Sequence, residues 1–268
     1  MTRTLQPGQR CEVWIASATG GRELVYTSED LLLEAPNWTP DAGTLVLNGD
    51  GKLWTLDVAG RSLAQVPLTG IPDLNNDHVL DPGGGHIFLS ASDGHIYRAA
   101  LGGGQAARLT RDDGSSHFLH GVSPDGRELA YVGIEGHCDG PEYSPDGGWL
   151  YFNTEAFTSR PGHAQLARVR AAGASDGGTA ASPERLLESD TVDWFPHLSP
   201  DGSLASYIRF PSGTEGHPAD LPVDVVLVST DDWATPLHTW PLFGGQGTLN
   251  VNSWAPDSAR FAYVAYPF

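Results

Sequence analysis

Short runs of alternating hydrophobic and polar residues follow one another along the whole chain. Examples are CEVWIAS (11–17), RELVYTS (22–28), TLVLN (44–48) and WLYFN (149–153). Alternation with a period of two is typical of β-strands that bury one face. The glycine- and proline-rich stretches between the runs are typical of turns. The pattern therefore predicts an all-β chain made of many short strands.

A turn motif built from proline and aspartate recurs six times between these runs. The copies are NWTPD (37–41), VLDPG (79–83), VSPDG (122–126), YSPDG (143–147), LSPDG (198–202) and WAPDS (254–258). Proline fixes φ, and aspartate and glycine favour turn positions, so each copy predicts a strand, a tight turn and a strand. A second hairpin follows most copies, as at 52–68 and 95–110. A repeated unit of four antiparallel strands is the blade of a β-propeller.

The spacing of the repeat prolines (40, 82, 124, 145, 200 and 256) predicts the number of blades. The intervals are 42, 42, 21, 55 and 56 residues. A four-stranded blade needs about 40 residues, so residues 120–134 predict only two strands. The hairpins at 11–28 and 253–267 together complete one blade and close the ring. We expect a single domain over 1–268, a six-bladed propeller with a two-stranded third blade, with a five-bladed ring as the alternative.

The second strand of the short blade, at 128–134, is predicted to lack an outer neighbour. Exposed edge strands invite pairing with another chain. We therefore expect a homodimer through this edge, with coverage by the loop at 135–142 or at 153–163 as the alternative.

The repeat is similar to the WD40-like repeats of the TolB β-propellers. The strings EAPNW (34–38), NNDH (75–78), DGPEYSPDG (139–147), DWFPHLSPDG (193–202) and LFGGQGT (242–248) resemble those of small, stand-alone TolB-like proteins. This resemblance extends over nearly the whole chain and implies the propeller fold, whereas repeats of this kind say little about function. We therefore expect the separate N-terminal domain of periplasmic TolB to be missing, because blade strands begin near residue 11.

Net charge and the distribution of apolar residues limit the classes of binding partner and the cellular location that we expect. The chain has 15 Lys and Arg against 33 Asp and Glu, a formal net charge of −18, so nucleic acid would be repelled. No apolar run approaches the length of a membrane span, and the first residues lack the pattern of a secretory signal. We therefore expect a cytoplasmic protein with Cys11 and Cys138 as free thiols.

Polar residues gather at the starts of the predicted innermost strands and in the loops beside them. In a four-stranded meander these positions share one face of the ring, around the mouth of the central channel. His78, His120 and His197 stand in nearly the same register there, and packing alone gives no reason to repeat imidazole. The residues expected to bind a polar ligand at this mouth are Asn37, Asn76, Asp77, His78, His120, Asp139, Glu142, Trp194, His197, His217, Gln246 and Asn250.

Three kinds of chemistry remain open for this mouth. Polar groups beside a tryptophan face favour a small polar ligand, with carbohydrate as the expected class. Neutral imidazoles suit Mn, Fe or Zn, and the divalent metal expected at the mouth is Mn, Zn or Ca. His78, His120, His197 and Gln246 resemble the three-histidine-plus-glutamine manganese site of oligogalacturonate lyases. That resemblance implies a metal-dependent lyase- or hydrolase-like activity. The alternative is a non-catalytic scaffold of the TolB type that holds a partner's peptide in its channel.

Overall fold

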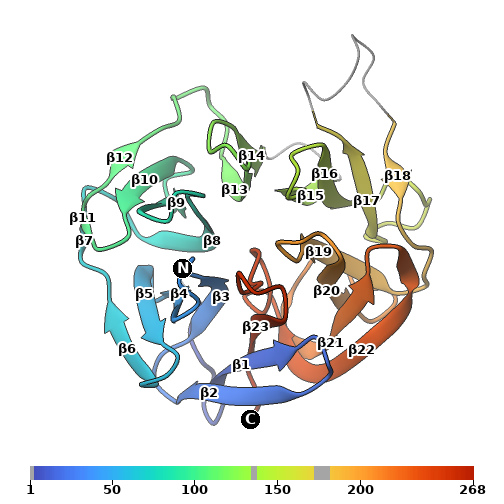
Figure 1. Ribbon diagram of the computed structural model, residues 1–268, viewed down its shortest axis with the longest axis horizontal. Helices are drawn as coiled ribbons and strands as arrows, with labels where there is room; N and C mark the ends of the chain where they lie inside the picture. The colour runs from blue at the N-terminus through green and yellow to red at the C-terminus, as the bar shows by residue number, and fades with distance from the viewer. Residues whose placement is uncertain (1–2, 134–137, 172–181) are drawn as a thin grey trace.

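The computed structural model describes residues 3–133, 138–171 and 182–268, which form 23 strands arranged as a ring (Figure 1). Within these ranges all regular structure is β, and no helix is long and apolar enough to span a membrane. The all-β propeller predicted from the sequence is confirmed.

Two four-stranded blades form the first part of the ring, each paired antiparallel in chain order apart from one short insertion. The first contains β3 (Leu33–Trp38), β4 (Thr44–Gly49), β5 (Lys52–Asp57) and β6 (Ser62–Gln65). The second contains β8 (Leu74–Leu80), β9 (His86–Ala91), β10 (Ile96–Ala100) and β12 (Ala107–Arg108). A short parallel pair, β7 (Leu68–Thr69) with β11 (Gly104–Gln105), links the chain after β6 to the turn after β10.

The chain then forms a two-stranded unit followed by two further four-stranded blades. The unit contains β13 (Phe118–Val122) and β14 (Leu129–Val132). The first blade after it contains β15 (Cys138–Tyr143), β16 (Trp149–Thr154), β17 (Gln165–Arg170) and β18 (Glu184–Arg185). The second contains β19 (Val192–Leu198), β20 (Leu204–Phe210), β21 (Ala219–Ser229) and β22 (Asp232–Gly245).

Both ends of the chain contribute to the blade that closes the ring. Its strand order is β2 (Arg22–Ser28), β1 (Cys11–Ser17) and β23 (Arg260–Ala265), and Trp254 adds an isolated bridge to Phe261 on the inner side. The register pairs Glu12 with Ala265 and Ser17 with Arg260. The predicted closure by the N- and C-terminal hairpins is thus present.

The number of blades corrects the preferred prediction. The described residues form five sheets of three or four strands, so the propeller has five blades, which is the alternative that the sequence left open, and the six-bladed count is wrong. The predicted two-stranded unit does exist, between β12 and β15. Only 21 residues separate Pro124 from Pro145, enough for one hairpin and a connection but not for four strands.

The repeated aspartates stabilise the turns that join the first two strands of a unit. Asp201 accepts hydrogen bonds from the Ser199 hydroxyl (2.7 Å) and from the Ser203 backbone N–H (3.0 Å). These bonds, with the one from Ser199 the largest cause, lower the pKa of Asp201. Asp146 accepts the equivalent bonds from Ser144 and Gly148. The repeat motif is therefore a set of turns rather than a set of catalytic acids.

The hydrophobic core lies between neighbouring blades. One cluster joins Leu47 of β4 and Cys11 of β1 to Val264 of β23. Another joins Leu166 of β17 to Tyr207 of β20. These side chains are fully buried, because each sheet presents an apolar face to the next one around the ring.

A bulge before a proline interrupts three of the innermost strands. Ala35, Gly140 and Phe195 each precede a proline and have positive φ values of 53°, 61° and 55°. The pairing register shifts at these points, between Glu34 and Asn37, between Asp139 and Glu142, and between Trp194 and His197. A bulge re-aims the side chains beside it, so these three strands enter the ring with Glu34, Asp139 and Trp194 in equivalent places.

The edge of β14 leads to our first prediction. Tyr131 on this strand is 46% exposed, and β14 pairs only with β13 among the described residues. Residues 134–137 of the predicted edge and of the loop expected to cover it lie outside the described residues.

We expect a dimer by multi-angle light scattering at micromolar concentration, which Tyr131→Lys should convert to monomer because edge lysines oppose strand pairing. Leu109→Lys, at an equally exposed site, is the control. A monomeric wild type would contradict the prediction.

Candidate functional site

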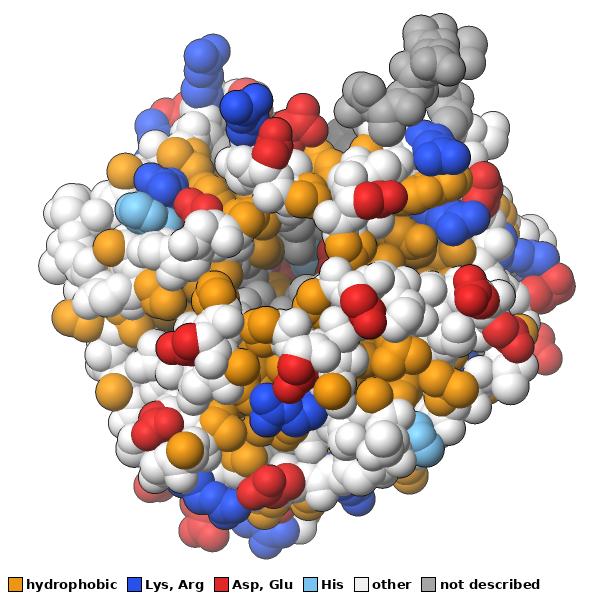
Figure 2. Space-filling view, in the orientation of Figure 1, with side chains coloured by type: hydrophobic (Ala, Val, Ile, Leu, Met, Phe, Trp, Pro, Cys, Tyr) orange, Lys and Arg blue, Asp and Glu red, His pale blue; other side chains and the backbone are white. Residues whose placement is uncertain are grey.

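The ring is hollowed at its centre (Figure 2), and residues of the inner strands and their loops enclose a cavity of about 290 Å³. We call it the mouth cavity. Its lining residues are Asn75, Asn76, Asp77, Phe118, His120, Val132, Asp139, His217, Gln246 and Asn250. They come from β8, β13, β14, β15 and the segments before β21 and after β22, so the cavity depends on closure of the ring.

Seven of the twelve residues that the sequence placed at the mouth line this cavity. They are Asn76, Asp77, His120, Asp139, His217, Gln246 and Asn250. The other five, Asn37, His78, Glu142, Trp194 and His197, lie outside the lining. Phe118 and Val132 were not predicted. They pair across β13 and β14 and form an apolar wall.

Asp139 bridges two histidines at the centre of the site. Its Oδ1 lies 3.1 Å from His120 Nε2, and its Oδ2 lies 3.5 Å from His217 Nε2. Burial alone would raise the pKa of Asp139, but the hydrogen bonds from the two imidazoles hold this pKa well below its usual range. Asp139 is therefore an anion at neutral pH.

His120 is the matching cation. Burial opposes its charged form, but the carboxylates of Asp77 and Asp139 outweigh burial and raise the pKa of His120 to about 9. The hydrogen bonds agree with this charge, since Nε2 donates to Asp139 and Nδ1 donates to the Asn250 carbonyl oxygen at 3.4 Å. His120 is thus a fixed positive group with both N–H groups occupied.

Asp77 is a second carboxyl in the cavity with a different environment. Asn75 Nδ2 donates to Asp77 Oδ2 at 2.9 Å, and the Asp77 N–H donates to Asn75 Oδ1 at the same distance. Burial is the main cause that raises the pKa of Asp77; Asp139 raises it further and His120 opposes the shift. The site therefore combines one carboxyl whose pKa is lowered with a second whose pKa is raised.

Two aromatic residues support the histidines from behind. Phe195 stacks on His120 with ring centroids 5.7 Å apart, and it meets His217 edge-on at 5.1 Å. Trp194 lies 4.5 Å from the His217 ring. The Phe195 N–H is bonded to Asn153 Oδ1. Gly140 makes this packing feasible, because a Cβ there would lie 2.7 Å from Phe195 Cδ1.

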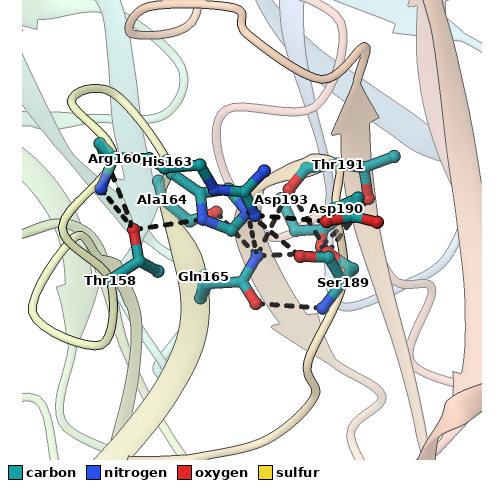
Figure 3. A network of polar contacts seen from close by, with 9 residues as sticks. All are labelled: Thr158, Arg160, His163, Ala164, Gln165, Ser189, Asp190, Thr191 and Asp193. Carbon is teal, nitrogen blue, oxygen red and sulfur yellow. Dashed lines mark hydrogen bonds and ion pairs between the residues drawn. The ribbon is translucent and has the colours of Figure 1, made fainter.

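A polar network fixes the segment that leads into these aromatics (Figure 3). Ser189 Oγ donates to Asp193 Oδ2 at 2.6 Å, and Gln165 Nε2 donates to Ser189 Oγ at 3.1 Å. Asp193 also pairs with Arg209 at 3.2 Å. Burial raises the pKa of Asp193, and it outweighs Ser189 and Arg209, which lower this pKa. Because Asp193 directly precedes Trp194, the network holds the aromatic support in place.

Glu142 and His197, both predicted at the mouth, form a buried brace instead. His197 Nδ1 lies 2.6 Å from Glu142 Oε2, and His197 Nε2 donates to the Leu249 carbonyl oxygen at 3.1 Å. Glu142 Oε1 also accepts from the Leu198 N–H (2.9 Å) and from Asn252 Nδ2 (2.7 Å). Both ring nitrogens of His197 are therefore engaged within the protein.

The remaining predicted residues also pack inside the ring. His78 is fully buried, and burial lowers its pKa to about 4, so its ring is neutral. Asn37 Nδ2 donates to the Asn252 carbonyl oxygen at 3.0 Å. Neither side chain lines the mouth cavity.

The donors do not fit the predicted metal ion. Of His78, His120, His197 and Gln246, only His120 and Gln246 line the same cavity. His197 is engaged at both nitrogens, and the N–H groups of His120 are occupied by Asp139 and Asn250. Across residues 3–133, 138–171 and 182–268, no three His, Cys, Asp or Glu side chains have an arrangement that could hold a metal.

A second cavity of about 400 Å³, which we call the side cavity, adjoins the mouth cavity. It is lined by Arg3, Glu34, Asp73, Leu74, Asn75, Asn76, Ser92 and Gln246. Arg3 donates to the Gln246 carbonyl oxygen (2.7 Å) and pairs with Asp220 (2.8 Å) and Glu34 (3.3 Å). The sequence offered no motif for these contacts, because Arg3 and its partners lie far apart in the chain.

One sequence feature could have identified more of the lining. The residues six positions before the repeat prolines are Glu34, Asn76, Phe118, Asp139, Trp194 and Asn250. Five of these six line the mouth or the side cavity, and the sixth, Trp194, contacts His217. A single consistent offset from the turn motif therefore marks the ring of residues around the mouth.

Comparison with known proteins places the chain in a family. It is 37% identical over 263 residues to an uncharacterized protein of Agrobacterium fabrum, covering 88% of this chain and 85% of that protein. A structure from Agrobacterium tumefaciens, described as a candidate TolB, superposes with a TM-score of 0.85 at 34% identity, over 97% of this chain and 99% of that one.

More distant likeness is confined to the fold. An oligogalacturonate lyase from Vibrio parahaemolyticus superposes with a TM-score of 0.51 at 13% identity, over 96% of this chain and 77% of that one. No family model matches the sequence. The repeats, the ring and the Agrobacterium relatives together lead to one conclusion: the chain belongs to the TolB-like β-propeller family.

Proposed function

We propose that this protein binds a small polar ligand of the carbohydrate class in the mouth cavity. The observation that carries the proposal is a set of buried polar atoms on the lining residues that have no hydrogen-bond partner among the described residues. They are His217 Nδ1, Gln246 Oε1 and Asn250 Nδ2. Each such atom costs about 1–3 kcal/mol while it is unpaired. A ligand with hydroxyl groups, which both donate and accept, suits this mixture of donors and acceptors.

The apolar wall gives the site a second property that a sugar would use. Phe118 is 37% exposed and pairs with Val132 beside the cavity. A pyranose ring presents C–H groups on its faces and hydroxyl groups around its edge. An aromatic face opposite amide and imidazole groups matches that division.

The charges of the cavity favour a neutral ligand. Asp139 is an anion, and His120, its cation, is already paired with it. Asp77 adds a further carboxyl, and the whole chain carries −18. Among the described lining residues, a negatively charged sugar would therefore meet no lysine or arginine.

Binding is proposed rather than metal-dependent lyase or hydrolase chemistry, because the four expected metal ligands do not come together. A TolB-type scaffold that holds a peptide remains the rival. Unpaired polar atoms can also bond to a peptide backbone. Carbohydrate binding and the peptide scaffold are therefore distinguished by which ligand binds, and not by the geometry of the cavity.

Phe118→Ala tests the proposal by isothermal titration calorimetry. The probes are glucose, galactose, mannose and N-acetylglucosamine, with their disaccharides. We expect at least one to bind, and we expect Phe118→Ala to weaken it about five- to tenfold, since an aromatic face contributes about 1 kcal/mol. Leu237→Ala, at a 47% exposed apolar site on β22, is the matched control.

Two results would reject the proposal. One is the absence of binding by every sugar of the panel, which would favour the peptide scaffold. The other is an equal effect of Phe118→Ala and Leu237→Ala on the sugar that binds best.

A further inference from the structure

The mouth cavity and the side cavity share one wall. Asn75, Asn76 and Gln246 line both of them. Gln246 Oε1 is buried without a partner among the described residues, and so is Nε of Arg3, which lines the side cavity. Unpaired polar atoms thus occur on the residues of both compartments and on the wall between them.

We propose that the ligand is a neutral oligosaccharide of at least two linked units, with one unit in each cavity. This inference rests on the proposed function and adds the length of the ligand and the neutrality of its second unit. The shared wall of amide side chains would face the linkage between the two units, since amides offer both donors and acceptors to the flanking hydroxyl groups.

Size supports two compartments rather than one. Sites for small molecules commonly enclose about 300–1,000 Å³. The mouth cavity, at about 290 Å³, lies at the lower end of that range, and the side cavity adds about 400 Å³. One sugar unit would leave the second compartment and its polar groups to water.

The contacts of Arg3 fix the shape of the side cavity. The Arg3 guanidinium lies 4.1 Å from the centre of the Tyr266 ring and pairs with Glu34 and Asp220. Its bond to the Gln246 carbonyl oxygen fixes the wall between the cavities. Gly247, next in the chain, leaves no space for a Cβ, which would lie 2.5 Å from Glu34 Oε1 and 2.6 Å from the Tyr266 hydroxyl.

The charges of the side cavity disfavour an acidic second unit. Arg3 is its cationic side chain, and Glu34 and Asp220 already share it. Asp73, also in the lining, pairs outward with Lys52 at 2.7 Å. A carboxylate on the ligand would therefore lie near Glu34 and Asp73, and the described lining residues offer it no lysine or arginine without an acidic partner.

Chain-length dependence tests this inference by calorimetry. The probes are glucose, cellobiose and cellotriose, and N-acetylglucosamine, chitobiose and chitotriose, with glucuronic acid as the charged comparison. In the wild type we expect the disaccharide of the series that binds to exceed its monosaccharide at least tenfold, and we expect no binding of glucuronic acid.

Ser92→Trp places a large side chain in the side cavity at an exposed position, so the fold should tolerate it. We expect this variant to lower the affinity for the disaccharide to that of the monosaccharide and to leave the monosaccharide unchanged. Ser62→Trp, at an exposed position on β6 outside both cavities, is the matched control and should bind every probe like the wild type.

The outcomes separate the two proposals. If a monosaccharide binds and the disaccharide gains nothing, the proposed function stands and the two-unit ligand is rejected. The two-unit ligand is also rejected if Ser92→Trp weakens the monosaccharide as much as the disaccharide, or if glucuronic acid binds as well as glucose. If no sugar binds, both proposals fail.

Discussion

Replacing Glu142 by alanine is expected to lower the free energy of unfolding by about 3–5 kcal/mol, the cost of removing one partner of a buried charged pair. Glu142 accepts hydrogen bonds from His197, Leu198 and Asn252, so the change removes the acceptor of the buried His197 Nδ1 and of the Leu198 N–H, and leaves Asn252 Nδ2 with only the Leu198 carbonyl oxygen. For a chain of this size the melting temperature should fall by roughly 6–20 °C. Thermal and urea unfolding followed by circular dichroism would measure both quantities.

Glu23→Ala is the control for this prediction. Glu23 also forms a salt bridge, with Arg61 at 2.7 Å, but the two side chains are 66% and 55% exposed. Exposed pairs of this kind contribute less than about 1 kcal/mol. Equal effects of the two substitutions would show that the brace around Glu142 does not stabilise the ring.

Stability is expected to decline between pH 6.5 and pH 9. The pKa of His120 is about 9 in the folded protein, above its ordinary value of 6.5, so the folded state holds a proton that the unfolded state releases in this interval. The stabilisation is complete below pH 6.5 and lost as the pH rises through 9. A shift of this size corresponds to about 3 kcal/mol.

The acid side of the profile has other causes. The pKa of Asp139 is lowered in the folded state, so its contribution is present above its ordinary value and lost as the pH falls below that value. The pKa of His78 is lowered to about 4, so protonation of the unfolded chain favours unfolding below pH 6.5. Stability should therefore be greatest near pH 6.5.

Unfolding by urea at a series of pH values would give this profile, and His120→Asn should flatten the part between pH 6.5 and 9. His86→Asn, at a half-exposed site, should leave it unchanged. An unaltered slope in His120→Asn would contradict the assignment of the proton to His120.

The propeller could be predicted from the sequence because its signals are local. Each turn around a repeat proline is made by residues within five positions of one another, as with Ser199, Asp201 and Ser203. Closure by the two terminal hairpins followed from the incomplete units at both ends. The number of blades depended on whether the hairpin of β13 and β14 counts as a separate blade, and the spacing of the repeat prolines does not decide this.

The candidate site was only partly predictable because a strand changes the face of a side chain with every residue. His120 stands four residues before its repeat proline and His197 stands three before its own. A difference of one residue turns a side chain to the opposite face of a strand. His120 reaches the cavity, while His197 meets Glu142 inside the ring. His78 has the same offset as His120 but is buried, next to a register shift between Leu74 and His78. The bulges at Gly140 and Phe195 shift the register again, and no local pattern predicted them.

The pairing of β1 with β23 has a consequence for the order of folding. It joins residues about 250 positions apart, as with Glu12 and Ala265. Contacts so distant in sequence form slowly, because closing a long loop costs conformational entropy before the new contacts contribute any stabilisation. During synthesis the edge of β1 that later pairs with β23 stays unpaired until residues 260–265 have been made. Ring closure is therefore expected to be the late and slow step, and the open ring the form most exposed to aggregation.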